Sequence, residues 1–245
     1  MKSFYFRCVV AASILLLSAC TESGENMYIT GDSEREYFNE ITKTVGYRYH
    51  LFIPDYKIPD GGYPMLLFLH GAGERGNDLD LVKLHGINNM LTVYDPLPFI
   101  VISPQVPDGG WWDSESLNAL IDHAVASYPV DTERIYVTGL SMGGYGTWDL
   151  IIRYPGRFAA AIPICGGGNW LLAHRAKDVP VLAFHGDADP VIPLERSVEM
   201  VEALQEAGGN ATLTVYPGTG HDAWTPTYGN KEMYEWLLQF KRKSE

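Results

Sequence analysis

Seven apolar runs along the chain have the length of β-strands. They cover residues 47–53, 65–70, 99–103, 134–138, 159–164, 181–185 and 212–216. The middle runs are continuously apolar rather than alternating, which is typical of strands covered by helices on both faces. Segments with apolar residues at helical spacing lie between them or follow them, at 116–127, 145–154, 194–207 and 232–241. This alternation predicts an α/β fold: a mainly parallel, twisted sheet of about seven or eight strands, with the first strand or two antiparallel at its edge.

The N-terminus has the pattern of an export segment. Lys2 and Arg7 supply positive charge, and the run at 8–19 is apolar or small and too short to span a bilayer. It ends in Leu-Ser-Ala-Cys, which resembles a bacterial lipobox whose cysteine, here Cys20, is lipidated. We therefore expect a lipoprotein signal peptide at 1–19, a tether at 20–27 and one catalytic domain at 28–245. The alternative is an ordinary secretion signal that happens to precede a cysteine.

Composition and charge agree with one exported globular domain. Of the 245 residues, 46% are hydrophobic and 20% are charged, which suffices for one well-filled core. The formal net charge of −12 makes nucleic acid a poor partner, so we expect membrane contact only through the N-terminal lipid. With Cys20 lipidated and Cys8 removed with the signal peptide, only Cys165 remains, and we expect it to be a packed thiol without a disulfide.

The candidate nucleophile is Ser141 in Gly-Leu-Ser-Met-Gly-Gly. A predicted strand precedes this segment and a predicted helix follows it, which is the context that a Gly-x-Ser-x-Gly turn requires. Glycines flank the serine because side chains at those positions would collide in so tight a turn. The serine hydroxyl would then stand at a helix N-terminus, where backbone N–H groups favour negative charge. The alternative is a turn with a purely structural role.

A serine hydroxyl needs a base, and histidine is the natural one near neutral pH. In this strand–turn–helix arrangement the order along the chain is serine, acid, histidine. Of the histidines that follow Ser141, His221 lies in a glycine-rich loop after a strand and is the predicted base. His174 is expected on the surface, and His185 is expected to brace a turn.

The acid should lie in the loop after the strand at 181–185. Asp187 and Asp189 both lie there. We favour Asp189, which is deeper in the loop and better placed to reach the imidazole, and expect Asp187 to cap the turn. The acid would fix the tautomer of His221 and stabilise its charged form.

Backbone N–H groups are expected to hold the oxyanion that forms on attack. One donor should be Met142, directly after the nucleophile. The other should be Ala72 or Gly73, in the glycine-rich loop after the strand at 65–70. His70 would then brace this loop.

Aromatic and charged residues in the neighbouring loops are candidates for substrate contact. Trp111, Trp112 and Trp224 lie in loops expected at the catalytic edge and would suit sugar rings or aromatic acyl groups, although each would equally serve to close the edge of the core. Glu74, Arg75 and Asp78 are expected to form a local charge network, or else to contact substrate. Residues 77–95 fit either a helix interrupted at Gly86 or a loop over the site.

Together these segments resemble α/β-hydrolases of the prolyl-oligopeptidase-like, dienelactone-hydrolase-like and feruloyl/acetyl-esterase-like group, and in particular the exported bacterial "predicted peptidase"/esterase proteins. The resemblance rests on LHGAGERGND at 69–78, SPQVPDGGWW at 103–112, GLSMGGYGTWDL at 139–150, FHGDADPVIP at 184–193 and GHDAWTPTY at 220–228. It implies the α/β-hydrolase fold and a triad of Ser141, Asp189 and His221. Dienelactone hydrolases differ at the nucleophile, where cysteine replaces serine.

The resemblance implies a serine hydrolase that cleaves carboxylic esters, such as acetyl or feruloyl esters of plant cell-wall polysaccharides. The alternatives are a serine peptidase acting on short peptides and a non-catalytic binding protein with the same fold. The substrate would be a small molecule or an ester borne on a polysaccharide. We expect no cofactor and no metal, because the histidines are scattered and none pairs with acids at metal-ligand spacing. The expected location is the cell envelope, with the periplasmic and surface faces both open.

Overall fold

A computed structural model describes residues 43–91 and 97–242 of the chain. The predicted signal peptide, the tether and Cys20 lie outside these residues. Within the described part, no helix combines the length and the apolar character that crossing a membrane requires.

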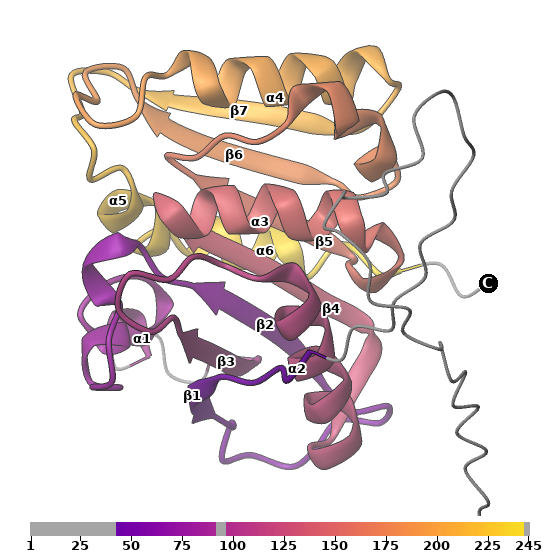
Figure 1. The fold of residues 1–245 in the computed structure, drawn as a ribbon. Helices are drawn as coiled ribbons and strands as arrows, with labels where there is room; N and C mark the ends of the chain where they lie inside the picture. The colour runs from indigo at the N-terminus through magenta and orange to yellow at the C-terminus, as the bar shows by residue number, and fades with distance from the viewer. Residues whose placement is uncertain (1–42, 92–96, 243–245) are drawn as a thin grey trace, which may run out of the picture. The chain divides into compact units, whose positions relative to one another are not determined.

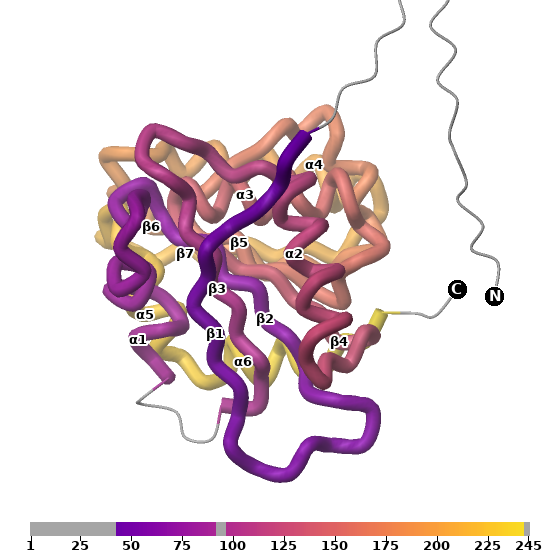
Figure 2. The backbone as a smooth tube through the Cα atoms, turned by 60° about the horizontal axis from the view of Figure 1, so that its bottom comes forward, coloured from indigo at the N-terminus to yellow at the C-terminus, as the bar shows by residue number. Residues whose placement is uncertain are grey.

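The described chain forms a seven-stranded sheet (Figure 1). Its strands lie in the order β1-β3-β2-β4-β5-β6-β7, and all neighbours are parallel except β1, which pairs antiparallel with β3. Figure 2 shows β1 running along the edge of the sheet beside β3. The strands are β1 (Arg48–Phe52), β2 (Tyr63–Leu69), β3 (Ile100–Gln105), β4 (Val130–Leu140), β5 (Ala160–Ile164), β6 (Val181–Gly186) and β7 (Ala211–Tyr216). The predicted fold class and every predicted strand are confirmed.

The continuously apolar strands arise because both faces of the sheet are buried. In β2, Met65, Leu67 and Leu69 enter one hydrophobic cluster, whereas Leu66 and Phe68 enter the other. Successive side chains of a strand point to opposite faces, so a sheet with two covered faces needs apolar residues at every position. The lack of alternation between apolar and polar residues therefore indicates a hydrophobic core on each face of the sheet.

Helices cover both faces. On one face lie α2 (Ser114–Ser127), α3 (Met142–Arg153) and α4 (Glu195–Glu206), whose buried residues share one cluster. On the other lie α1 (Ile87–Met90), α5 (Trp224–Tyr228) and α6 (Lys231–Leu237). Short 3₁₀ turns complete the chain: η1 (Ala72–Glu74), η2 (Leu81–Lys83), η3 (Pro155–Arg157) and η4 (Trp170–Ala176).

Three predicted helix boundaries differ from the observed ones by two residues or more, and one of them is the start of α3, which begins at Met142 instead of 145. Helix α2 begins two residues earlier than expected, because the carboxylate of Asp113 accepts a hydrogen bond from the Ser116 N–H and caps the helix. Helix α6 ends at Leu237 instead of continuing to 241. Within 77–91, two short helical turns, η2 and α1, are separated by Gly86, whose φ of 73° and close contact with the Phe68 ring suit only glycine.

The backbone of helix α3 packs directly against the backbone of the sheet. A Cβ atom on Gly143 would lie 1.9 Å from the carbonyl oxygen of Leu69, and one on Gly139 would lie 2.4 Å from the carbonyl oxygen of Gly143. Neither obstacle is a flexible side chain, so the strand and the helix would have to separate. The glycines that flank Ser141 are therefore required by packing between β2, β4 and α3.

We predict that Gly143→Ala destabilises the protein by at least about 3 kcal/mol, because overpacking against backbone atoms leaves no rotamer that relieves the contact. The free energy of unfolding, measured by urea denaturation, checks this. Gly156→Ala is the matched control, since nothing lies within 4 Å of a Cβ atom there. Equal stability of the two variants would refute the packing argument.

Candidate active site

Ser141 lies at the tight turn between β4 and α3. Its backbone has φ 53° and ψ −115°, a region that residues other than glycine rarely adopt. The turn is held by hydrogen bonds from the Ser141 N–H to the Ile164 carbonyl (2.9 Å) and from the Tyr145 N–H to the Ser141 carbonyl (3.2 Å). The strained conformation is thus fixed from both sides, by β5 and by the first turn of α3.

The structure brings His221 and Asp189 together with Ser141. Nε2 of His221 lies 2.9 Å from the Ser141 hydroxyl oxygen, and Nδ1 of His221 lies 2.7 Å from Oδ2 of Asp189. Ser141 follows β4, Asp189 follows β6 and His221 follows β7, so all three lie beyond the carboxyl ends of parallel strands, where open α/β sheets bind ligands. A hydroxyl, an imidazole and a carboxylate in this sequence can pass a proton from Ser141 to His221.

Asp189 is held in its ionised form. Burial would raise its pKa, but hydrogen bonds from His221 and from the N–H groups of Ile192 and Val191 outweigh burial and leave the pKa below its usual value. The side chain is fully buried. A charged acid is therefore available to orient His221 near neutral pH.

Asp187 has a different task. Its carboxylate accepts a 2.6 Å hydrogen bond from the Gly218 N–H and so joins the loop after β6 to the loop that carries His221. Of the two candidate acids in this loop, only Asp189 contacts the imidazole of His221 in the described residues.

The loop after β2 contains the predicted second oxyanion donor. Gly71 lies directly against the nucleophile, since a Cβ atom on it would be 3.6 Å from Cβ of Ser141. Ala72 and Gly73 open the turn η1, and Met142 opens α3. The first N–H groups of a helix have no partner within it, so Met142, Ala72 and Gly73 all present backbone donors.

His70 braces this loop as a neutral ring. Its Nδ1 donates to the carbonyl of Gly71 (2.5 Å), and its Nε2 accepts from the N–H of Val106 (3.0 Å). Burial lowers the pKa of His70 to about 4, since it disfavours the charged ring. Protonation at Nε2 would break the bond to Val106, so the geometry of the loop depends on the neutral form.

The three tryptophans have different environments. Trp111 is exposed and lies beside the guanidinium of Arg75 (5.7 Å) and the ring of Tyr145 (6.3 Å). Trp224 is half-buried and packs edge-on against the ring of His221, with centroids 5.1 Å apart.

Trp112 does not line the site. It is 6% exposed in the hydrophobic core and donates its indole N–H to the carbonyl of His70. Of the two roles expected for Trp112, its burial agrees with closing the edge of the core, because the loop before α2 turns one tryptophan outward and its neighbour inward.

Two contacts near the triad were not named in the sequence-based expectations. The buried carboxylate of Glu74 has an oxygen without a hydrogen-bond partner and lies 3.9 Å from Nδ1 of His70 and 3.9 Å from Nε2 of His85. Cys165 has φ 47° and directs its thiol at the carbonyl of His221 (3.2 Å). Its place directly after β5, next to the strand that ends at the nucleophile, is the only sequence cue for this contact.

Cys165, Asp189 and His221 bring their ligand atoms within 4.8 Å of one another. This group is a poor metal site. Burial raises the pKa of the Cys165 thiol to about 12, so it stays protonated, and Asp189 and His221 already bind each other.

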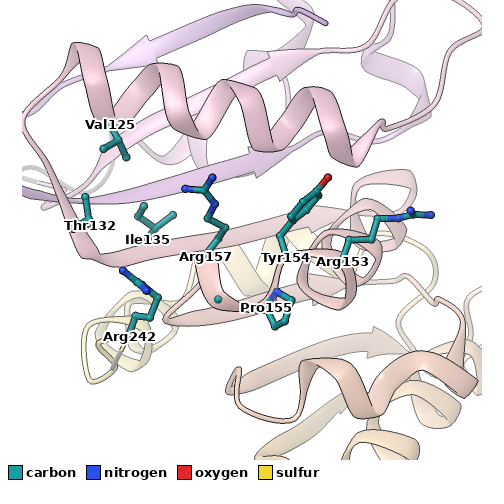
Figure 3. Close-up of a pocket in the computed structure, with 9 residues that line it drawn as sticks. Val125, Thr132, Ile135, Arg153, Tyr154, Pro155, Arg157 and Arg242 are labelled. Carbon is teal, nitrogen blue, oxygen red and sulfur yellow. The ribbon is translucent and has the colours of Figure 1, made fainter. Parts of the chain in front are cut away.

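A pocket of about 660 Å³ lies at the other end of β4 from Ser141 (Figure 3). Thr132 and Ile135 line it from the first half of the strand, and Arg153, Arg157 and Arg242 lie around it. Arg153 is paired with Asp149 and Arg157 with Asp122. The pocket contains none of the residues predicted for catalysis.

Comparison with known proteins places these features in a family context. The phospholipase/carboxylesterase family matches residues 113–233, which include Ser141, Asp189 and His221. The crystal structure of a thermostable esterase is similar, with 39% identity and a TM-score of 0.73 over 79% of this chain and 59% of that one.

Two curated relatives also match. A bifunctional acetylxylan esterase/xylanase of Neocallimastix patriciarum is 30% identical over 151 residues, 58% of this chain and 21% of that protein. A probable feruloyl esterase C of Aspergillus niger is 26% identical over 237 residues, 90% of this chain and 84% of that protein. The chain therefore spans only a fifth of the first relative and most of the second.

We predict that the neutral, buried His70 makes stability depend on pH. Between about pH 6.5 and pH 4 the unfolded chain binds a proton at this residue and the folded chain does not, so the free energy of unfolding falls as the pH falls. The loss at pH 4 should approach about 3 kcal/mol. Urea denaturation of the wild type and His70→Asn across this range checks this.

The variant should have a shallower pH dependence than the wild type between these limits. His174→Asn is the control, because His174 is exposed and the slope should be retained. Parallel curves for the wild type and His70→Asn would contradict the assignment of His70 as the neutral brace.

Proposed function

We propose that this chain, which has the α/β-hydrolase fold and resembles esterases, hydrolyses carboxylic esters through an acyl-enzyme formed on Ser141. The observation that carries the proposal is the continuous contact from Asp189 through His221 to the Ser141 hydroxyl. The strained turn at Ser141 supports it, because strain of this kind persists where the surrounding structure maintains it for chemistry.

The first half of the reaction forms the acyl-enzyme. The Ser141 hydroxyl attacks the ester carbonyl while its proton moves to Nε2 of His221. The carbonyl oxygen becomes an oxyanion, which the N–H of Met142 and that of Ala72 or Gly73 would stabilise. When the intermediate collapses, the bond to the leaving oxygen breaks, and His221 returns the proton to the departing alcohol.

The second half releases the acid. A water molecule takes the place of the alcohol and gives a proton to His221 as its oxygen attacks the acyl carbon. The second intermediate collapses, the carboxylic acid leaves, and Ser141 regains its proton. Asp189 stays ionised throughout, holds the Nδ1 proton of His221 and stabilises the charged ring that exists between the two transfers.

The proposed substrates are acetyl or feruloyl esters carried by polysaccharides. The names of the acetylxylan and feruloyl esterase relatives support this class. The exposed ring of Trp111, and Trp224 against His221, offer flat surfaces of the kind that sugar and phenolic rings stack on. Trp112 plays no part in this proposal.

We predict that Ser141→Ala lowers turnover of p-nitrophenyl acetate by about 1,000-fold or more, since no other group supplies the nucleophile. Asp189→Asn should fold normally and lose about 100-fold or more in kcat, because it no longer fixes the imidazole. Ser127→Ala, at an exposed serine, is the control and should keep full activity. Acetylated xylan, methyl ferulate and a short peptide anilide, assayed in parallel, identify the substrate class.

Full activity of Ser141→Ala on the esters would rule out the acyl-enzyme. Cleavage of the anilide in preference to the esters would instead identify a peptidase.

We further propose that Cys20 carries a lipid that anchors the enzyme to the cell envelope, on the strength of the charged, apolar and small-residue pattern of residues 1–20. Cys20→Ala should release the protein from the membrane fraction into the soluble one, because a lipid chain supplies the apolar contact with the bilayer. Immunoblotting of fractionated cells measures the distribution. Cys165→Ala is the control and should leave it unchanged, and an unaltered distribution of Cys20→Ala would exclude lipidation.

A further inference from the structure

The acid of the proposed triad has a second imidazole beside it. His185 lies in β6, four residues before Asp189, and both side chains are completely buried. Nε2 of His185 lies 3.2 Å from Oδ2 of Asp189, the same oxygen that binds His221. Two rings thus converge on one carboxylate oxygen, although the proposed chemistry uses only one of them.

The surroundings of His185 determine where its proton lies. Besides Asp189, Nε2 is 2.9 Å from the carbonyl oxygen of Ile192. A carboxylate and a carbonyl can only accept hydrogen bonds, so Nε2 must carry the hydrogen, which it donates to the carbonyl of Ile192 while it lies 3.2 Å from Oδ2 of Asp189. His185 therefore presents a polar N–H group next to the carboxylate of Asp189.

The same ring supports the other oxygen of Asp189 indirectly. Oδ1 accepts hydrogen bonds from the N–H of Val191 (2.8 Å) and the N–H of Ile192 (3.0 Å). His185 holds the carbonyl of that same Ile192. His185 therefore lies against Oδ2 directly and supports Oδ1 through Ile192, which restricts rotation of the carboxylate away from His221.

Nδ1 of His185, the other ring nitrogen, begins a series of contacts that reaches helix α3, which follows Ser141. Nδ1 lies 2.7 Å from the hydroxyl oxygen of Ser197, which in turn lies 2.8 Å from the carbonyl of Gly166. The single hydroxyl proton of Ser197 can serve either contact. Gly166 packs against the backbone of Gly144 in α3 so closely that a Cβ atom on it would lie 2.5 Å from the Gly144 carbonyl carbon.

These contacts form a second connection between the acid and the nucleophile. One runs through His221 and carries the proposed proton transfer. The other runs from Asp189 through His185, Ser197 and Gly166 to helix α3, and is buried throughout. A buried chain of close polar contacts of this kind restricts the movement of its members, because leaving a buried polar group unpaired costs about 1–3 kcal/mol.

We propose that His185 is a positioning residue, which holds Asp189 in register with Ser141 by placing its Nε2 N–H beside Oδ2 and by anchoring Ile192, whose own N–H binds Oδ1. The proposal rests on the proposed serine-hydrolase function, since it assigns His185 a task only if Asp189 orients the base. It goes beyond bracing of a turn, because it makes the donor at Nε2 necessary for the reaction rate.

Two substitutions separate the N–H at Nε2, which contacts Ile192 and Asp189, from the rest of the ring. The amide nitrogen of glutamine reaches about as far as Nε2, so His185→Gln can keep the donor. The amide of asparagine reaches only about as far as Nδ1, so His185→Asn can keep the contact with Ser197 but loses the one with Asp189. Both variants replace an aromatic ring by a smaller amide, so general packing defects should affect them alike.

We expect His185→Asn to lower kcat for p-nitrophenyl acetate by about 10- to 100-fold with KM nearly unchanged, the size of effect seen when a group that orients an active-site ligand is lost. His185→Gln should stay within about threefold of the wild type. Thermal unfolding shows whether each variant is folded. Wild-type kcat in a folded His185→Asn, or an equal loss in both variants, would overturn the proposal.

If either variant fails to unfold cooperatively, Ser197→Ala supplies the test. It leaves the His185 ring in place but removes its link to Gly166, and kcat should fall by about three- to tenfold while KM is kept. Unchanged kcat in Ser197→Ala would then overturn the proposal.

The labelling rate of Ser141 by a fluorophosphonate separates failure of this inference from failure of the proposed function. A wild type that neither labels at Ser141 nor turns over esters contradicts the serine-hydrolase function itself. A wild type that labels rapidly, beside a folded His185→Asn that labels equally fast, contradicts only the positioning role of His185.

Discussion

Helix α3 meets the sheet backbone to backbone at the turn that carries Ser141, and the rest of the site is arranged around this contact. Gly143 lies against the Leu69 carbonyl at the end of β2, and Gly144 lies against the Ile164 carbonyl at the end of β5. The two strands that flank β4 are thereby held at fixed distances from the nucleophile. The β2 loop can then bring its N–H groups beside Ser141, and the chain after β5 can bring Gly166 beside α3.

The acid and the base depend on a second close approach. A Cβ atom on Gly186, where β6 ends, would lie 2.1 Å from the carbonyl oxygen of Thr219, so the loops after β6 and β7 touch through their backbones. The hydrogen bond from the Gly218 N–H to Asp187 holds this contact from the other side. Backbone contacts at glycines thus set the distance between the loops, and hydrogen bonds to Asp189 and His221 then set the positions of these two side chains.

The sequence predicted what depends on local pattern and chain order. Continuous apolar runs indicate strands with two buried faces, and the order of Ser141, Asp189 and His221 along parallel strands brings them to one edge. The features that the sequence could not predict depend on tertiary contacts between loops. Trp111 and Trp112 are adjacent and chemically identical, and only the path of the loop before α2 makes one exposed and the other buried. Likewise, the contact between His185 and Asp189 exists because the chain turns back on itself after β6, which no periodicity encodes.

The residues that orient the proposed catalytic groups are buried, whereas Trp111, a residue proposed for substrate contact, is exposed. Asp189, His185 and His70 are buried and satisfied by backbone or side-chain partners, so a change at any of them disturbs several bonds at once. Trp111 is exposed and lies beside Arg75 and edge-on to Tyr145, and it can be replaced without leaving a buried polar group unpaired. Because α/β-hydrolases share a fold but act on different esters, variation is expected where replacement is least costly. Under the proposed function, the loops around Trp111 can therefore vary with the ester that is bound, while the residues at the strand ends keep the same cleavage reaction.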